Sequence, residues 1–143
     1  MRALDSDEMK SLTDWTSQLL ACAMAIYARP WKAPVSSPQK VEADIEISDI
    51  LLPEEMATAE TYYLAAKKRI GLLETSILDI QCLFFASIYE KHAFRPLQAW
   101  FYVQQASTRL QTRLMRRKPR EQSDSPPRHL EQRVFWSCVK SEW

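Results

Sequence analysis

The chain has 143 residues, of which 46% are hydrophobic and 26% are charged, and its formal net charge is +1. This composition is typical of soluble globular domains, and the small net charge gives no general attraction to nucleic acid or membranes. The chain has one glycine and eight prolines, which disfavours sheets because their tight turns usually use glycine. The sequence therefore predicts an all-α fold, a partial helical bundle of about five helices joined by long loops.

The first predicted helix runs from about Asp7 to Ala28. Its apolar residues recur at helical spacing and are expected to form the buried stripe: Leu12, Trp15, Leu19, Cys22, Ala23 and Ile26. Residues 29–52 follow, and their prolines interrupt helical structure, so this segment is predicted to be a linker. The domain organisation expected is an N-terminal amphipathic helix (1–28), a linker (29–52) and a bundle (53–143).

The second predicted helix begins at Pro53 and ends before Gly71. Proline suits the first helical position, and acids in the first turn favour the positive end of the helix dipole. Glycine just after the last turn is a common stop. The expected apolar face consists of Ala59, Tyr62, Tyr63, Ala66 and Ile70.

The third predicted helix follows Ser76 and Asp79, which are spaced as a capping box, and ends near His92. From Ile77 to Tyr89 it is apolar on nearly every side. Thirteen residues are too few to span a bilayer, which needs about 20. We therefore expect this helix to lie at the centre of the bundle, with Phe84 packed in the core.

The fourth predicted helix runs from Pro96 to about Arg117, and the fifth begins near His129. Their expected buried positions are Leu97, Trp100, Val103, Leu110 and Leu114 in the fourth helix and Leu130, Val134, Phe135, Cys138 and Val139 in the fifth. The aromatic residues Tyr62, Tyr63, Trp100, Phe101 and Tyr102 are interpreted as core or near-core packing. The apolar stripe still continues at Trp143 without a capping residue, so the chain is expected to be the front part, or a truncated copy, of something larger.

The three cysteines, Cys22, Cys82 and Cys138, each lie in an apolar helical pattern and form no CxxC pair. They are expected to be buried, reduced thiols, which favours a reducing compartment. The acidic N-terminus does not have the charge and apolar pattern of a signal peptide.

Residue types that carry chemistry are sparse. His92 and His129 are the only histidines, and neither belongs to an HExxH or similar ligand pattern. One glycine cannot make a Gly-rich phosphate loop, and cysteines within apolar stripes are poor nucleophiles. The sequence therefore predicts no catalytic, cofactor-binding or metal-binding residues and no enzyme activity.

The basic stretch "RLQTRLMRRKPR" spans residues 109–120. It could contact a phosphate backbone or serve in nuclear import, but no aromatic residue alternates with its cations for base stacking. Positive charge also complements the end of a helix dipole. We expect a solvated helix end, and direct DNA contact by this chain is not expected.

Three segments within residues 59–143 follow one another in order: "AETYYLAAKKRIGLLE", "SILDIQCLFFASIYEKHAFRPLQAWFYVQQASTRLQ" and "EQRVFWSCVKSEW". Together they resemble the middle regulatory region of fungal zinc binuclear cluster transcription factors. The resemblance implies an all-α region that controls activation and performs no chemistry. The family's zinc cluster needs six closely spaced cysteines, and this chain has three scattered ones.

The predicted function is a transcription regulator, as a fragment or truncated form without its DNA-binding zinc cluster, acting through protein contacts or effector sensing. One alternative is a stand-alone helical interaction module or dominant-negative partner of full-length regulators, and another is a small-molecule-binding helical domain. The expected partners are proteins of the transcription machinery or a homologous regulator, with a dimer left open and no membrane or cofactor. The expected location is the nucleus, with the cytoplasm as the alternative.

Overall fold

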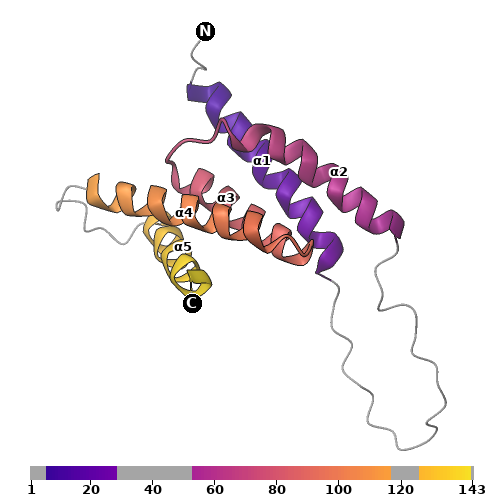
Figure 1. Cartoon of the computed structure of the whole chain (residues 1–143). Coiled ribbons are helices and arrows are strands. Elements are labelled where there is room, and N and C mark those ends of the chain that lie inside the picture. Colours follow the sequence, from indigo (N-terminus) through magenta and orange to yellow (C-terminus); the bar gives the residue numbers. More distant parts are fainter. Residues whose placement is uncertain (1–5, 29–52, 117–125, 143) are drawn as a thin grey trace, which may run out of the picture.

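The computed structural model describes residues 6–28, 53–116 and 126–142, and those residues form helices and short turns without strands (Figure 1). The helices are α1 (Ser6–Tyr27), α2 (Pro53–Ile70), α3 (Ile77–His92), α4 (Pro96–Arg116) and α5 (Pro126–Glu142). The predicted all-α fold is confirmed. The predicted linker 29–52 and residues 117–125 lie outside the described part. None of the described helices has the length and apolar character needed to cross a membrane.

Local sequence signals set the ends of three helices. Proline occupies the first position of α2 and of α4, where its missing N–H is not needed. The predicted capping box of α3 is present, because Ser76 Oγ accepts from the Asp79 N–H at 3.1 Å and Asp79 Oδ2 accepts from the Ser76 N–H at 3.2 Å. α2 ends one residue before Gly71, although that glycine does not adopt a positive φ.

The helices form two antiparallel pairs, with α5 across the second pair (Figure 1). α1 packs along α2, and α4 packs along α3. α3 also contacts α1, α2 and α5, so it touches every other described helix. The prediction that this apolar helix lies at the centre of the bundle is therefore confirmed, and α1 belongs to the same bundle.

Buried side chains from all five helices form one core. Among its members are Leu20 of α1, Tyr63 of α2, Leu83 of α3, Leu110 of α4 and Val134 of α5. Eight of the sixteen residues of α3 are buried, which explains why its sequence is apolar around most of its circumference. Phe84 is only half-buried but packs against this core.

The predicted stripe of α1 is right for Ala23, which is buried, and for Leu19 and Ile26, which pack against the core, but it is wrong for Trp15 and Cys22. Thr13, Thr16, Leu20 and Ala23 are buried, whereas Trp15 and Cys22 are exposed. The threonines tolerate burial because the Thr16 hydroxyl donates to the Leu12 carbonyl at 2.7 Å and the Thr13 hydroxyl donates to a carboxylate oxygen of Asp79 at 2.6 Å. These small, satisfied side chains let α1 lie close to its neighbours.

Several aromatic and apolar residues that were expected in the core are exposed. Tyr62, Leu97, Trp100, Phe101 and Phe135 all expose more than a third of their surface, whereas Tyr63, Tyr102 and Val103 are buried as expected. The physical reason in α4 is that only two described helices, α3 and α5, contact it. Its second apolar face therefore has no neighbour within the described chain.

Candidate functional site

The two histidines lie apart from one another and from any cluster of ligands. His92 stacks on the ring of Tyr27, with a centroid distance of 5.6 Å and an interplanar angle of 22°. His129 is exposed on α5. Within the described ranges, no three His, Cys, Asp or Glu side chains come together as a metal site would require.

The most polar feature of the interior is the carboxylate of Glu90, which is completely buried near the end of α3. Its Oε1 accepts a hydrogen bond from the Tyr63 hydroxyl, and its Oε2 accepts one from Arg95 Nε. The Lys67 ammonium lies 3.8 Å from Oε1. A buried carboxylate is costly unless it is paired and hydrogen-bonded, and both conditions hold here.

Arg95 extends this arrangement to a second carboxylate on α2. Its Nη1 and Nη2 donate to the two oxygens of Glu60, at 2.9 and 3.2 Å. The Tyr89 hydroxyl donates to Oε2 of the same glutamate at 2.7 Å. We call Glu60, Tyr63, Lys67, Tyr89, Glu90 and Arg95 the Glu90 network.

Ring packing completes the Glu90 network. The rings of Tyr63 and Tyr89 are stacked, with centroids 4.1 Å apart and an interplanar angle of 14°. The guanidinium of Arg95 lies 5.6 and 5.9 Å from the two ring centroids, within the range of cation–π attraction. The two tyrosine rings, which belong to the core, therefore pack against the guanidinium of Arg95 as well as against each other.

The protonation states follow from this geometry. The hydrogen bonds from Arg95 lower the pKa of Glu60, while the Glu60 carboxylate raises the pKa of Arg95. Burial raises the pKa values of Tyr63 and Tyr89, and their bonds to Glu90 and Glu60 add to the effect. At neutral pH, Glu60 and Arg95 are therefore charged, whereas the two phenols are neutral.

The Glu90 network joins α2, α3 and the turn before α4. Its two carboxylates are balanced by two cations, and each carboxylate accepts from two network side chains. Such mutual pairing favours a structural role over acid–base chemistry. The sequence analysis missed this network, and the one available signal was Glu90, an acidic residue that directly follows the apolar run of α3 and lies five residues before Arg95.

Two arginines of the basic stretch are also engaged by the bundle, so the expectation that this stretch is simply solvated is wrong for them. Arg109 Nη1 donates to the carbonyls of Leu73 and Glu74, at 2.8 and 2.9 Å. Arg113 Nε donates to Glu131 Oε1 on α5, at 3.2 Å. Both side chains hold neighbouring segments against α4.

A cavity of about 530 Å³ opens where α1 meets the start of α3. Thr13 Oγ1 donates to Asp79 Oδ1 at 2.6 Å, and Asp79 Oδ2 accepts from the backbone N–H groups of Glu74 and Ser76. The buried polar groups beside the cavity therefore cap α3 and fasten it to α1.

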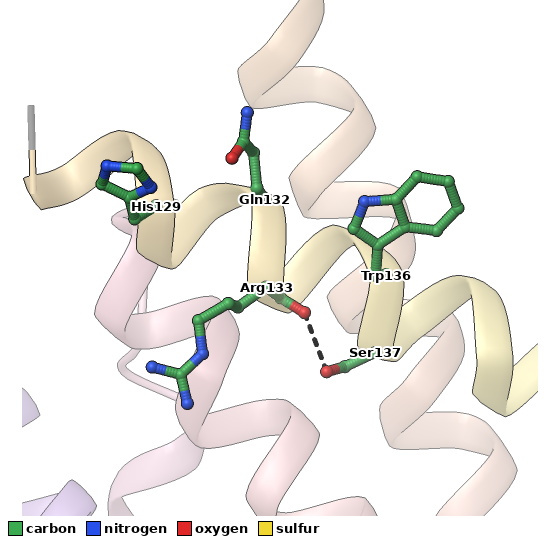
Figure 2. Close-up of a pocket in the computed structure, with 5 residues that line it drawn as sticks. All are labelled: His129, Gln132, Arg133, Trp136 and Ser137. Carbon is green, nitrogen blue, oxygen red and sulfur yellow. Dashed lines mark hydrogen bonds between the residues drawn. The ribbon is translucent and has the colours of Figure 1, made fainter. Parts of the chain in front are cut away.

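A second, shallower hollow lies on the outer side of α5. Figure 2 shows that all the side chains lining it, His129, Gln132, Arg133, Trp136 and Ser137, project from this one helix. The drawn hydrogen bond runs from the Ser137 hydroxyl to the Arg133 carbonyl, at 2.8 Å. No second element closes the hollow, which resembles an open helix surface more than an enclosed ligand site.

Comparisons with known families, with curated proteins and with solved structures give no match for this chain.

Proposed function

We propose that this chain acts in the regulation of transcription through protein contacts, as a fragment or truncated form of a regulator without its zinc cluster. The observation that carries the proposal is the ordered set of segments within residues 59–143 that resemble the fungal regulatory region. In this protein those segments include α3 and the turn between α3 and α4, and the Glu90 network stabilises that turn. The proposed action runs through protein contacts, and the sequence in hand contains no set of six closely spaced cysteines.

The surface supports action through protein contacts. Trp100 and Phe101 on α4 and Trp136 on α5 are each more than half exposed. Large exposed aromatic side chains are enriched in protein interfaces. The carboxylates of the Glu90 network, in contrast, are paired with its cations and tyrosines, which does not favour an enzyme.

A tethering experiment tests this proposal. The whole chain, fused to an unrelated DNA-binding module, is expected to change transcription of a reporter several-fold relative to the module alone. Trp100→Ala is expected to reduce the effect. Trp15→Ala is the matched control, because Trp15 on α1 is 60% exposed and Trp100 is 59% exposed. Reporter output equal to that of the module alone, with the fusion abundant in the nucleus, would contradict the proposal.

The alternative function is a stand-alone interaction module that blocks full-length regulators. The same exposed aromatic surface favours it. Co-expression would then lower the output of a full-length regulator that carries its own zinc cluster, and the two proteins would co-precipitate. The tethered chain would leave the reporter unchanged, which separates this alternative from the first proposal.

A further inference from the structure

The side of α4 that faces away from the core forms a regular, uncharged seam. Leu97, Phe101, Gln104, Thr108, Gln111 and Met115 follow one another at alternating spacings of four and three residues. This spacing places them on one face and is the repeat by which two helices pack along each other. Five of the six are exposed and Gln104 is half-exposed. We call these six residues the α4 seam.

The α4 seam contains no charged residue, and the bundle holds two of the three arginines of α4; the third, Arg116, is exposed in the last turn beside the seam. Arg109 is bonded to the turn after α2, and Arg113 is bonded to α5. Both side chains are therefore turned toward the bundle. The core side of α4, which includes Ala99, Val103 and Leu110, is buried.

An aromatic residue with an unusual backbone lies three residues before the α4 seam. Phe94 has φ 55°, in the left-handed region where glycine is usual. The Phe94 N–H donates to the Lys91 carbonyl, and the Arg95 N–H donates to the Glu90 carbonyl, which is the Schellman pattern that ends a helix. The Phe94 side chain is 92% exposed. Neither the backbone nor the core of this chain requires a phenyl group there.

We propose that the α4 seam is a homodimer interface, in which α4 packs antiparallel against α4 of a second copy of this chain. An uncharged surface meets its own copy without like-charge repulsion. The outer side of α5 is a poorer candidate for self-association, because it carries Arg133 and Lys140. Antiparallel pairing also aligns the two helix dipoles favourably. The inference rests on the proposed action through protein contacts, but not on a role in transcription.

The available apolar area is sufficient for such an interface. A whole aromatic side chain buries roughly 150–250 Å², so the exposed parts of Phe94, Trp100 and Phe101 present roughly 400 Å². This is about half of the ~800 Å² that each partner contributes to a standard interface. Leu97 and Met115, which are mostly exposed, add to it. Together these side chains supply most of the area that a standard interface needs from each partner.

Antiparallel pairing about a two-fold axis makes a definite register. Leu97 meets Met115 of the second copy, Phe101 meets Gln111, and Gln104 meets Thr108. Apolar contacts then lie at both ends of the α4 seam, and amide and hydroxyl groups pair in the middle. The contact is isologous, because each residue pair occurs twice.

The first test is the mass of the purified whole chain by analytical ultracentrifugation, with charge-exchange variants. Leu97→Glu is expected to weaken dimer formation at least about tenfold, and the Leu97→Glu, Met115→Lys double variant is expected to restore it. Within one helix these positions are about 27 Å apart, so restoration requires contact between two copies. Leu64→Glu on α2, where Leu64 is also exposed, is the control and should leave the dimer intact. A monomer throughout the micromolar range, or a double variant no better than Leu97→Glu alone, would overturn the proposal.

The second test uses Phe94→Gly. Glycine relieves the left-handed backbone and is expected to raise the midpoint of thermal unfolding by a few degrees, while dimer formation weakens. A variant that is more stable and dimerises as well as the parent chain would exclude Phe94 from the interface and reduce the proposed area. Neither measurement depends on the reporter, so the dimer can fail while the transcription proposal stands, and the reverse also holds.

Discussion

Arg95, one residue before α4, donates through Nη1 to Oε1 of Glu60 in α2 at 2.9 Å. The two residues are 35 positions apart in the sequence, and the helix between them, α3, contributes Glu90 to the same guanidinium. One side chain therefore connects three consecutive helices.

Removing the buried carboxylate should destabilise the protein strongly. Glu90→Ala leaves Arg95 and Lys67 without this partner and removes the acceptor of Tyr63. The buried Tyr63 hydroxyl left without its acceptor should alone cost about 1–3 kcal/mol, which urea unfolding followed by circular dichroism can measure. Glu54→Gln, at an exposed position in the first turn of α2, is the control, with an expected loss within about 1 kcal/mol. A similar loss in both variants would contradict the role assigned to Glu90.

Acidification should remove the contribution of Glu60. Its pKa in the folded protein is below the ordinary value of 4.5 because Arg95 stabilises the ionised form. Ionised Glu60 therefore stabilises the folded state above pH 4.5, and this contribution is lost as the pH falls through the lowered pKa. The difference in unfolding free energy between the parent chain and Glu60→Gln should shrink between neutral pH and about pH 3. A difference that is constant over this range would show that Arg95 does not stabilise the ionised carboxylate.

Two adjacent residues of α3 should differ in their tolerance of truncation. Leu83 is fully buried, so Leu83→Ala is expected to cost about 2–5 kcal/mol. Phe84 is half-buried at the edge of the core, so Phe84→Ala should cost less than the ~3–5 kcal/mol typical of a fully buried phenylalanine. Thermal and chemical unfolding of both variants measure this. The reverse order would mean that the exposed side of Phe84 is covered in solution.

The cysteines should react at very different rates with a thiol reagent. Cys22 is exposed on α1, whereas Cys82 and Cys138 are buried. Burial also raises the pKa of the Cys82 thiol to about 12, which suppresses the reactive thiolate. Mass spectrometry of the folded protein should therefore find one fast modification, at Cys22. Rapid modification of Cys82 without denaturant would contradict the packing of α1 against α3.

The sequence was sufficient to predict the helices, because their ends depend on local chemistry. Pro53, Ser76 and Pro96 each act within one helical turn. It was not sufficient for the buried side of α1 or α4, because periodicity cannot show which of two apolar stripes acquires a neighbour. In α1 the buried stripe contains Thr13 and Thr16. Because their hydroxyls form hydrogen bonds within the bundle, these polar residues can be buried, which their residue type alone does not predict.

The candidate site was less predictable than the fold. Glu60 and Arg95 come together only after α2, α3 and the following turn have packed, and no short motif contains both. The exposure of Trp100 and Phe101 depends in the same way on where α5 lies. The aromatic residues were predicted to be in or near the core, but the arrangement of the helices leaves several of them exposed to solvent.

The central position of α3 has an evolutionary consequence. A change in Ile77–His92 must suit four neighbouring helices at once, whereas Gln132 and Trp136 on the outer side of α5 are exposed. Related sequences are therefore expected to diverge first on the exposed faces of the helices, which are the surfaces available to binding partners. The sixteen residues of α3 should preserve the ancestry of this protein longer than any other segment that the structure describes.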